Sequence, residues 1–142
     1  MRFLIIDDEE NKVQEFIKTV QGIEGHESDT FTHKIARNSG LYELMIEGSD
    51  GLGKMRLDDS DRKYDVLVLD LNLPLLDDDR FPEKDMGLEV LSELNRKKWT
   101  IPVIIYSSEP RQLEQHYSHI KGYVTYGYYL KSVVEPILAT LK

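Results

Sequence analysis

The sequence contains no cysteine among its 142 residues. This absence excludes disulfide frameworks, thiolate zinc sites, thiol nucleophiles and iron–sulfur clusters. Basic residues are also scarce, because 18 Lys and Arg stand against 26 Asp and Glu and give a formal net charge of −8. A surface with this balance repels phosphate backbones, so we expect no direct nucleic-acid binding by this chain.

Long hydrophobic runs are missing as well. The longest stretch without a charged residue covers ten residues, 99–108, about half of the ~20 needed to cross a bilayer. The apolar run 3–6 meets four acidic residues directly, which is not the pattern of a signal peptide. Hydrophobic residues still make up 40% of the chain, enough to bury a core. We therefore expect a soluble, cytoplasmic protein without membrane contact, folded as a single domain over residues 1–142.

Three short runs, 3–6, 66–69 and 103–106, are continuously apolar. Such strands are typical of parallel sheets that helices cover on both faces. The segments around them have helical periodicity, with apolar residues at Val13, Phe16, Ile17 and Val20, at Leu88, Leu91 and Leu94, and at Val133, Val134, Ile137, Leu138 and Leu141. We expect two further strands at 42–46 and 128–130. This alternation predicts an α/β fold with a doubly wound parallel sheet.

Polar side chains follow these strands, at the sheet edge where such folds carry their function. Asp7 and Asp8 come after the first run, Asp70 after the second, Ser107 after the third, and Lys131 after the last expected strand. A single acid at such a position is often only a helix cap. Together, however, carboxylates, a hydroxyl and a lysine suit a divalent cation such as Mg²⁺ and a phosphoryl group.

Four segments carry a family resemblance: 5–9 (IIDDE), 65–74 (DVLVLDLNLP), 87–91 (GLEVL) and 102–108 (PVIIYSS). In this order they resemble the receiver domain of two-component response regulators, the CheY-like proteins. The resemblance implies a five-stranded parallel sheet with strand order 2-1-3-4-5, flanked by helices. It also implies a signalling domain that switches a protein-interaction surface toward a downstream protein. Such a domain is not an enzyme, although slow self-phosphorylation and autodephosphorylation are expected of it.

The resemblance also implies roles for individual residues. Asp70 matches the aspartate that accepts a phosphoryl group from a histidine kinase or phosphotransfer protein. Asp8, Asp70 and the backbone carbonyl of Asn72 match the Mg²⁺ ligands, and Asp7 matches an acid that acts on the metal indirectly. The remaining matched positions bind the phosphoryl group and switch on it (Ser107, Lys131, Tyr128) or tune dephosphorylation (Asn72, Glu109).

Some features depart from the family pattern. Ser107 and Lys131 are 24 residues apart, slightly more than usual. Segment 121–127 is therefore an alternative last strand, which would place Lys131 in a helix and leave the site without its cation. Two segments are enlarged: 22–40, expected to link the first helix to the second strand, and 75–86, beyond Asp70.

Two other functions compete with the receiver hypothesis. One is a receiver-like interaction domain that is never phosphorylated. The other is a phosphohydrolase with Asp70 as nucleophile, which is disfavoured because Asn72 stands where a second Asp would act as general acid.

Overall fold

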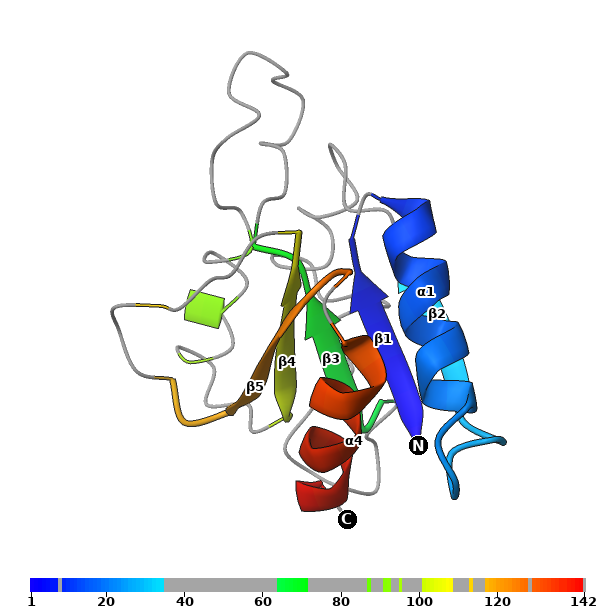
Figure 1. Cartoon of the computed structure of the whole chain (residues 1–142). Helices are drawn as coiled ribbons and strands as arrows, with labels where there is room; N and C mark the ends of the chain where they lie inside the picture. The colour runs from blue at the N-terminus through cyan, green and yellow to red at the C-terminus, as the bar shows by residue number, and fades with distance from the viewer. Residues whose placement is uncertain are drawn as a thin grey trace.

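The chain forms a parallel sheet with helices packed against it (Figure 1). The computed structural model describes residues 1–7, 9–34, 64–71, 87, 91–92, 95, 101–108, 113, 117–127 and 129–141. Its strands and helices are β1 (Arg2–Ile6), α1 (Glu10–Gln21), β2 (Thr30–Lys34), β3 (Val66–Leu69), β4 (Val103–Ser107), β5 (Ile120–Thr125) and α4 (Leu130–Thr140). The strand order is β2-β1-β3-β4-β5 and every pairing is parallel. The predicted fold class and strand order are thereby confirmed.

The three central strands are buried on both faces, as their continuous apolar runs predict. Successive side chains of a strand point to opposite faces, so β1 sends Leu4 and Ile6 into one hydrophobic cluster and Phe3 and Ile5 into the other. Strands β3 and β4 divide their side chains in the same way. Each fully buried aliphatic side chain stabilises the fold by roughly 1.5–3 kcal/mol, so the central strands anchor the sheet.

Helices α1 and α4 cover the same face of the sheet (Figure 1). The two helices contribute Phe16, Val20, Val134 and Leu138 to the cluster that also holds Phe3 and the other residues of that face. The predicted helical periods at both ends of the chain are therefore confirmed, except that Val133 is exposed and does not join the buried face of α4. In the middle period, Leu91 is helical and buried, whereas Leu88 and Leu94 lie outside the described residues.

The second strand is not where the sequence placed it. Strand β2, Thr30–Lys34, pairs with β1 from Arg2↔Thr30 to Ile6↔Lys34, and residues 42–46 lie outside the described part of the chain. Segment 22–40, expected to be an enlarged link, thus contains a strand. The sequence of β2, TFTHK, has Phe31 as its one apolar residue, because the strand lies at the end of the described sheet and is not buried on both faces.

The last strand was also misplaced. It is β5, Ile120–Thr125, and residues 128–130 are not a strand where the structure describes them, because Leu130 opens α4. The alternative that placed the strand within 121–127 is essentially confirmed. The pairing of β4 with β5 shifts by one residue, since Val103 pairs with Ile120 but Ile104 pairs with Gly122, which leaves Lys121 between the pairs.

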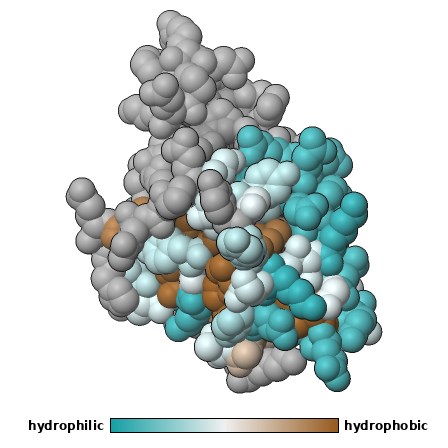
Figure 2. Space-filling model, in the orientation of Figure 1, coloured by the Kyte–Doolittle hydropathy of each residue, from teal (hydrophilic) through white to brown (hydrophobic). Residues whose placement is uncertain are grey.

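Gly122 explains why α4 lies so close to β5. A Cβ at this position would come within 2.8 Å of Ile137 Cγ1, so only a glycine accommodates the Ile137 side chain without a shift. None of the described helices is long and apolar enough to cross a membrane. Hydrophilic residues cover the side of the molecule on which α1 lies (Figure 2).

Candidate functional site

The carboxyl ends of the three central strands bring together three of the predicted site residues. Asp7 directly follows β1, Asp70 directly follows β3 and Ser107 is the last residue of β4. The strand register aligns Ile6 with Leu69, so the two aspartates that follow them are neighbours at one edge. The exposed fractions of Asp7, Asp70 and Ser107 are only 1%, 4% and 1%. Burial of this kind is unusual for acidic residues unless they are paired.

The cation that contacts both aspartates among the described residues is Lys12, which is not among the residues predicted for the site. Its Nζ atom lies 2.7 Å from Asp7 Oδ2 and 3.4 Å from Asp70 Oδ2, and the side chain is 1% exposed. One sequence signal pointed to this burial. Lys12 precedes Phe16 by four residues and therefore lies on the apolar face of α1.

Tyr106, the residue before Ser107, holds Lys12 in place. Its hydroxyl donates a hydrogen bond to the Lys12 carbonyl oxygen at 2.9 Å, and Lys12 Nζ lies 4.9 Å from the centre of its ring. At this distance the ring face attracts the ammonium. The Tyr106 ring also packs against Phe16, with centroids 5.2 Å apart. Burial raises the pKa of Tyr106, so its hydroxyl remains a hydrogen-bond donor.

Opposing effects of its surroundings act on the pKa of the Asp7 carboxyl group. Burial is the main influence and raises its pKa to about 6, helped by the nearby charge of Asp70 and opposed by Lys12. Its Oδ1 atom accepts a hydrogen bond from the Glu9 backbone N–H at 2.9 Å. Asp7 thus also stabilises the N-terminus of α1, as acidic side chains near a helix N-terminus do. Its backbone carbonyl oxygen lies 2.8 Å from His33 Nε2, which ties β2 to the same edge.

Of the remaining predicted site residues, the structure describes only Lys131. Asp8, Asn72, Glu109 and Tyr128 lie outside the described residues. Lys131 is exposed in the first turn of α4. The expectation that it directly follows the last strand is therefore wrong, because that strand ends at Thr125.

The donor set fits a divalent cation in part. Two buried carboxylates are the hard oxygen donors that Mg²⁺ prefers. Within the described residues, Asp7 Oδ2 accepts no hydrogen bond of good geometry, although it is ion-paired with Lys12, so it retains capacity for a further partner. The described residues contain no cluster of three or more Asp, Glu, Cys or His side chains that could hold a metal ion. Asp7 and Asp70 thus supply two carboxylates of the kind expected for the cation site, and the other expected ligands, Asp8 and Asn72, lie outside the described residues.

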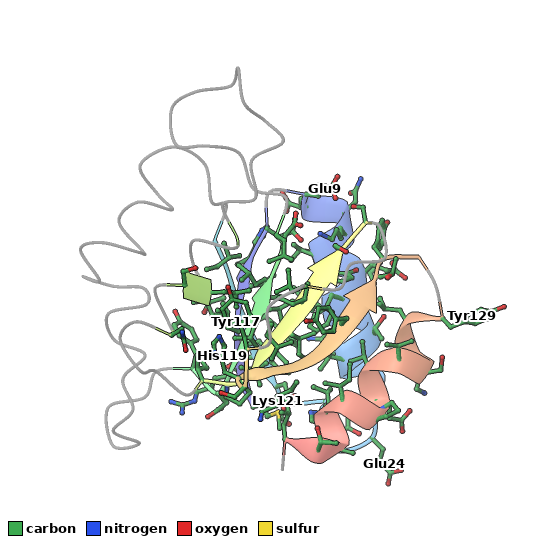
Figure 3. The ribbon with its side chains drawn as sticks, turned by 90° about the vertical axis from the view of Figure 1, so that its left-hand side faces the viewer. Glu9, Glu24, Tyr117, His119, Lys121 and Tyr129 are labelled. Carbon is green, nitrogen blue, oxygen red and sulfur yellow. The ribbon has the colours of Figure 1, made fainter. Side chains whose placement is uncertain are left out.

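A pocket of about 480 Å³ adjoins the group. It is lined by Glu9, Glu10, Asn11, Lys12, Ser108 and Tyr126. The Ser108 hydroxyl donates a hydrogen bond to Glu9 Oε2 at 3.0 Å, which joins the end of β4 to the start of α1. Figure 3 shows Glu9 at this end of the molecule, where α1 begins. The pocket therefore lies next to the group, at the start of α1.

No protein-family model matches the chain, and no curated protein matches it in sequence. Solved structures, by contrast, do match the chain in fold. A CheY-like receiver domain from Methylobacillus flagellatus is 19% identical, with a TM-score of 0.62 over 100% of this chain and 98% of that one. The N-terminal domain of a response regulator/sensory box/GGDEF protein from Carboxydothermus hydrogenoformans is 14% identical, with a TM-score of 0.62 over 99% and 93%. The Mn²⁺-bound response regulator Rcp1 is 17% identical, with a TM-score of 0.54 over 97% and 89%.

These likenesses establish the fold. The chain has the architecture of CheY-like response-regulator receiver domains over essentially its whole length.

Proposed function

We propose that the chain is a phosphorelay receiver in which Asp70 accepts a phosphoryl group from a histidine kinase or phosphotransfer protein. The observation that carries the proposal is the position of Asp70. It follows the central strand β3, is buried beside Asp7, and has the Lys12 ammonium 3.4 Å from its Oδ2 atom. The fold shared with receiver domains supports the same role.

In the proposed reaction, a carboxylate oxygen of Asp70 attacks the phosphorus of a phosphohistidine in line with the leaving nitrogen. The P–N bond breaks, its electron pair returns to the imidazole, and an acyl phosphate forms on Asp70. The carboxylates of Asp70 and Asp7 repel the incoming group, and the charge of Lys12 reduces this repulsion. The Ser107 hydroxyl at the end of β4 donates a hydrogen bond to a phosphoryl oxygen.

The residues that would hold Mg²⁺ are Asp8, Asp70 and the backbone carbonyl of Asn72, with Asp7 acting indirectly. When bound, the ion supplies positive charge that offsets the repulsion between the carboxylates and the phosphoryl oxygens. Among the structural neighbours, Rcp1 is described as Mn²⁺-bound and RcpA as phosphorylated, which supports both parts of the proposal.

The acyl phosphate adds about two negative charges and three strong acceptors at the site. We propose that this change biases a protein-interaction surface formed around β4 and β5, with no substrate turned over. The second candidate is a receiver-like interaction domain that is never phosphorylated. Lys12 favours this candidate in one respect, because its buried ammonium already offsets part of the charge of the two carboxylates without a metal.

Intact-mass analysis separates the two candidates. Wild-type protein is incubated with Mg²⁺ and a small phosphodonor such as acetyl phosphate, next to an Asp70→Asn variant whose folding is verified by circular dichroism. The receiver proposal predicts one added phosphoryl group on the wild type and none on the variant. A folded wild type that gains no phosphoryl mass would identify the interaction domain instead.

A further inference from the structure

Asp7, Asp70 and Lys12 form an unusual charge group. Two carboxylates share one ammonium, and all three side chains are at most 5% exposed. A buried charge without a partner is strongly destabilising, so this group requires internal compensation. Lys12 supplies it from α1, the helix that immediately follows the Asp7 strand.

We propose that Lys12 is the resident cation of this site, and that its ammonium weakens the binding of a divalent cation to Asp7 and Asp70. The inference rests on the proposed function only for the identity of the site and not on phosphorylation itself. The geometry carries it, since Lys12 Nζ contacts the Oδ2 atoms of both aspartates. A divalent cation that used these two oxygens would need the position of the ammonium.

Electrostatics adds to this steric competition. Like charges a few ångströms apart repel one another strongly when they are shielded from water. A fixed ammonium beside Asp7 and Asp70 therefore disfavours a second cation, even one held through other oxygens of the site. Removal of the positive charge should strengthen divalent-cation binding at least about tenfold.

The surroundings of Lys12 hold its side chain in place but allow its ammonium group to be displaced. Tyr106 binds its backbone carbonyl and faces its ammonium, so the side chain is positioned when the site is empty. Its Nζ atom makes no hydrogen bond of good geometry within the described residues, and the adjoining pocket presents Glu9 and Glu10. When a divalent cation enters, the ammonium moves toward these two acids.

The test compares Mn²⁺ binding to the wild type and a Lys12→Met variant by isothermal titration calorimetry. The matched control is Lys18→Met, which makes the same change in net charge at an exposed position of α1. We expect Lys12→Met to bind Mn²⁺ at least about tenfold more tightly than the wild type, and Lys18→Met to bind like the wild type. A Lys12→Met affinity that is unchanged, weaker or undetectable overturns the proposal.

Stability gives a second readout. Without metal, Lys12→Met removes the ammonium that contacts both buried carboxylates, so its melting temperature should fall in EDTA and recover on addition of Mn²⁺. If the variant does not fold under either condition, the double variant Lys12→Met/Asp7→Asn removes cation and carboxylate together and should fold again. A double variant that also fails to fold would mean that Lys12 is needed for its shape, and the proposal would be wrong.

The result is independent of phosphoryl transfer. A wild type that accepts no phosphoryl group contradicts the proposed function, yet the Mn²⁺ comparison still decides the role of Lys12. Conversely, the wild type could accept a phosphoryl group while the wild type and Lys12→Met bind Mn²⁺ equally well. This outcome would support the proposed function and contradict the proposal that Lys12 is the resident cation.

Discussion

At the scale of single residues, Gly87 shows how closely the chain packs behind Asp70. Its backbone N–H donates a hydrogen bond to the Leu71 carbonyl oxygen at 3.3 Å. A Cβ on Gly87 would lie 2.6 Å from the Asp70 carbonyl oxygen, a backbone atom that cannot turn aside. The absence of a side chain at position 87 therefore allows this segment to support the backbone that carries Asp70.

We expect Gly87→Ala to destabilise the protein by about 1–3 kcal/mol and to impair phosphoryl acceptance by displacing the Asp70 backbone. Urea unfolding and intact-mass analysis measure the two effects. Gly127→Ala is the matched control, because Gly127 has a φ of +88° but nothing within 4 Å of the added Cβ. Strain there should lower stability but leave phosphoryl acceptance intact. Wild-type stability in Gly87→Ala would contradict the packing described.

His119 is a second residue whose surroundings have a measurable consequence. It is 6% exposed, its ring centre lies 5.8 Å from that of Tyr117, and Nε2 has no hydrogen-bond partner within the described residues. Burial, and secondarily the charge of Lys121, lowers the pKa of His119 below its usual 6.5. Figure 3 places His119 and Tyr117 at the opposite end of the sheet from Glu9.

This lowered pKa predicts a pH dependence of stability. The unfolded chain protonates His119 more readily than the folded chain, so its contribution is complete above about pH 6.5 and is lost as the pH falls through the lower folded value. Melting temperatures of wild type and His119→Gln between pH 7.5 and 5 measure it. The wild type should lose more stability on acidification than the variant. Parallel curves would show that His119 titrates alike in both states.

At the scale of elements, α4 contains a built-in weakness. Pro136 lies in the interior of the helix Leu130–Thr140, although a proline is best tolerated in the first turn. It has no N–H to donate to the carbonyl of Ser132, four residues earlier, and its ring crowds that carbonyl. Its side chain is exposed, so packing does not explain it.

Replacement of Pro136 by Ala should therefore stabilise the protein, by up to about 3 kcal/mol, and raise its melting temperature. Differential scanning calorimetry checks this, with Glu135→Ala as a control at an adjacent exposed position, where a change within about 0.5 kcal/mol is expected. An unchanged or lower melting temperature in Pro136→Ala would show that the backbone of α4 has already adapted to the proline.

The elements also show how far sequence alone could predict this fold. Strands β1, β3 and β4 were found because burial on both faces produces continuous apolar runs. Strands β2 and β5 were misplaced because they lie at the edges of the sheet. In β5 exposed and partly buried residues alternate, and Gly122 weakens its strand pattern, so the tyrosines that follow gave a stronger apolar signal.

At the scale of the whole molecule, prediction of the site residues depends on two kinds of information: the order of the strands and the packing of distant segments. Asp7, Asp70 and Ser107 could be predicted because residues that directly follow parallel strands meet at one edge. Lys12 could not, since its role depends on how α1 packs against Tyr106 of β4, which is a distant part of the chain. The net charge of −8 likewise hides a buried group in which two negative charges and one positive charge offset each other in part.

The shift in register between β4 and β5 has a consequence for the molecule in crowded solution. Strand β5 ends the described sheet, and an edge strand with a regular row of backbone donors and acceptors invites a strand from another chain. At Lys121 the pairing is interrupted and the side chain is exposed and charged. A bulge and a lysine at an edge both oppose such addition. This irregularity thus protects the protein against edge-to-edge aggregation.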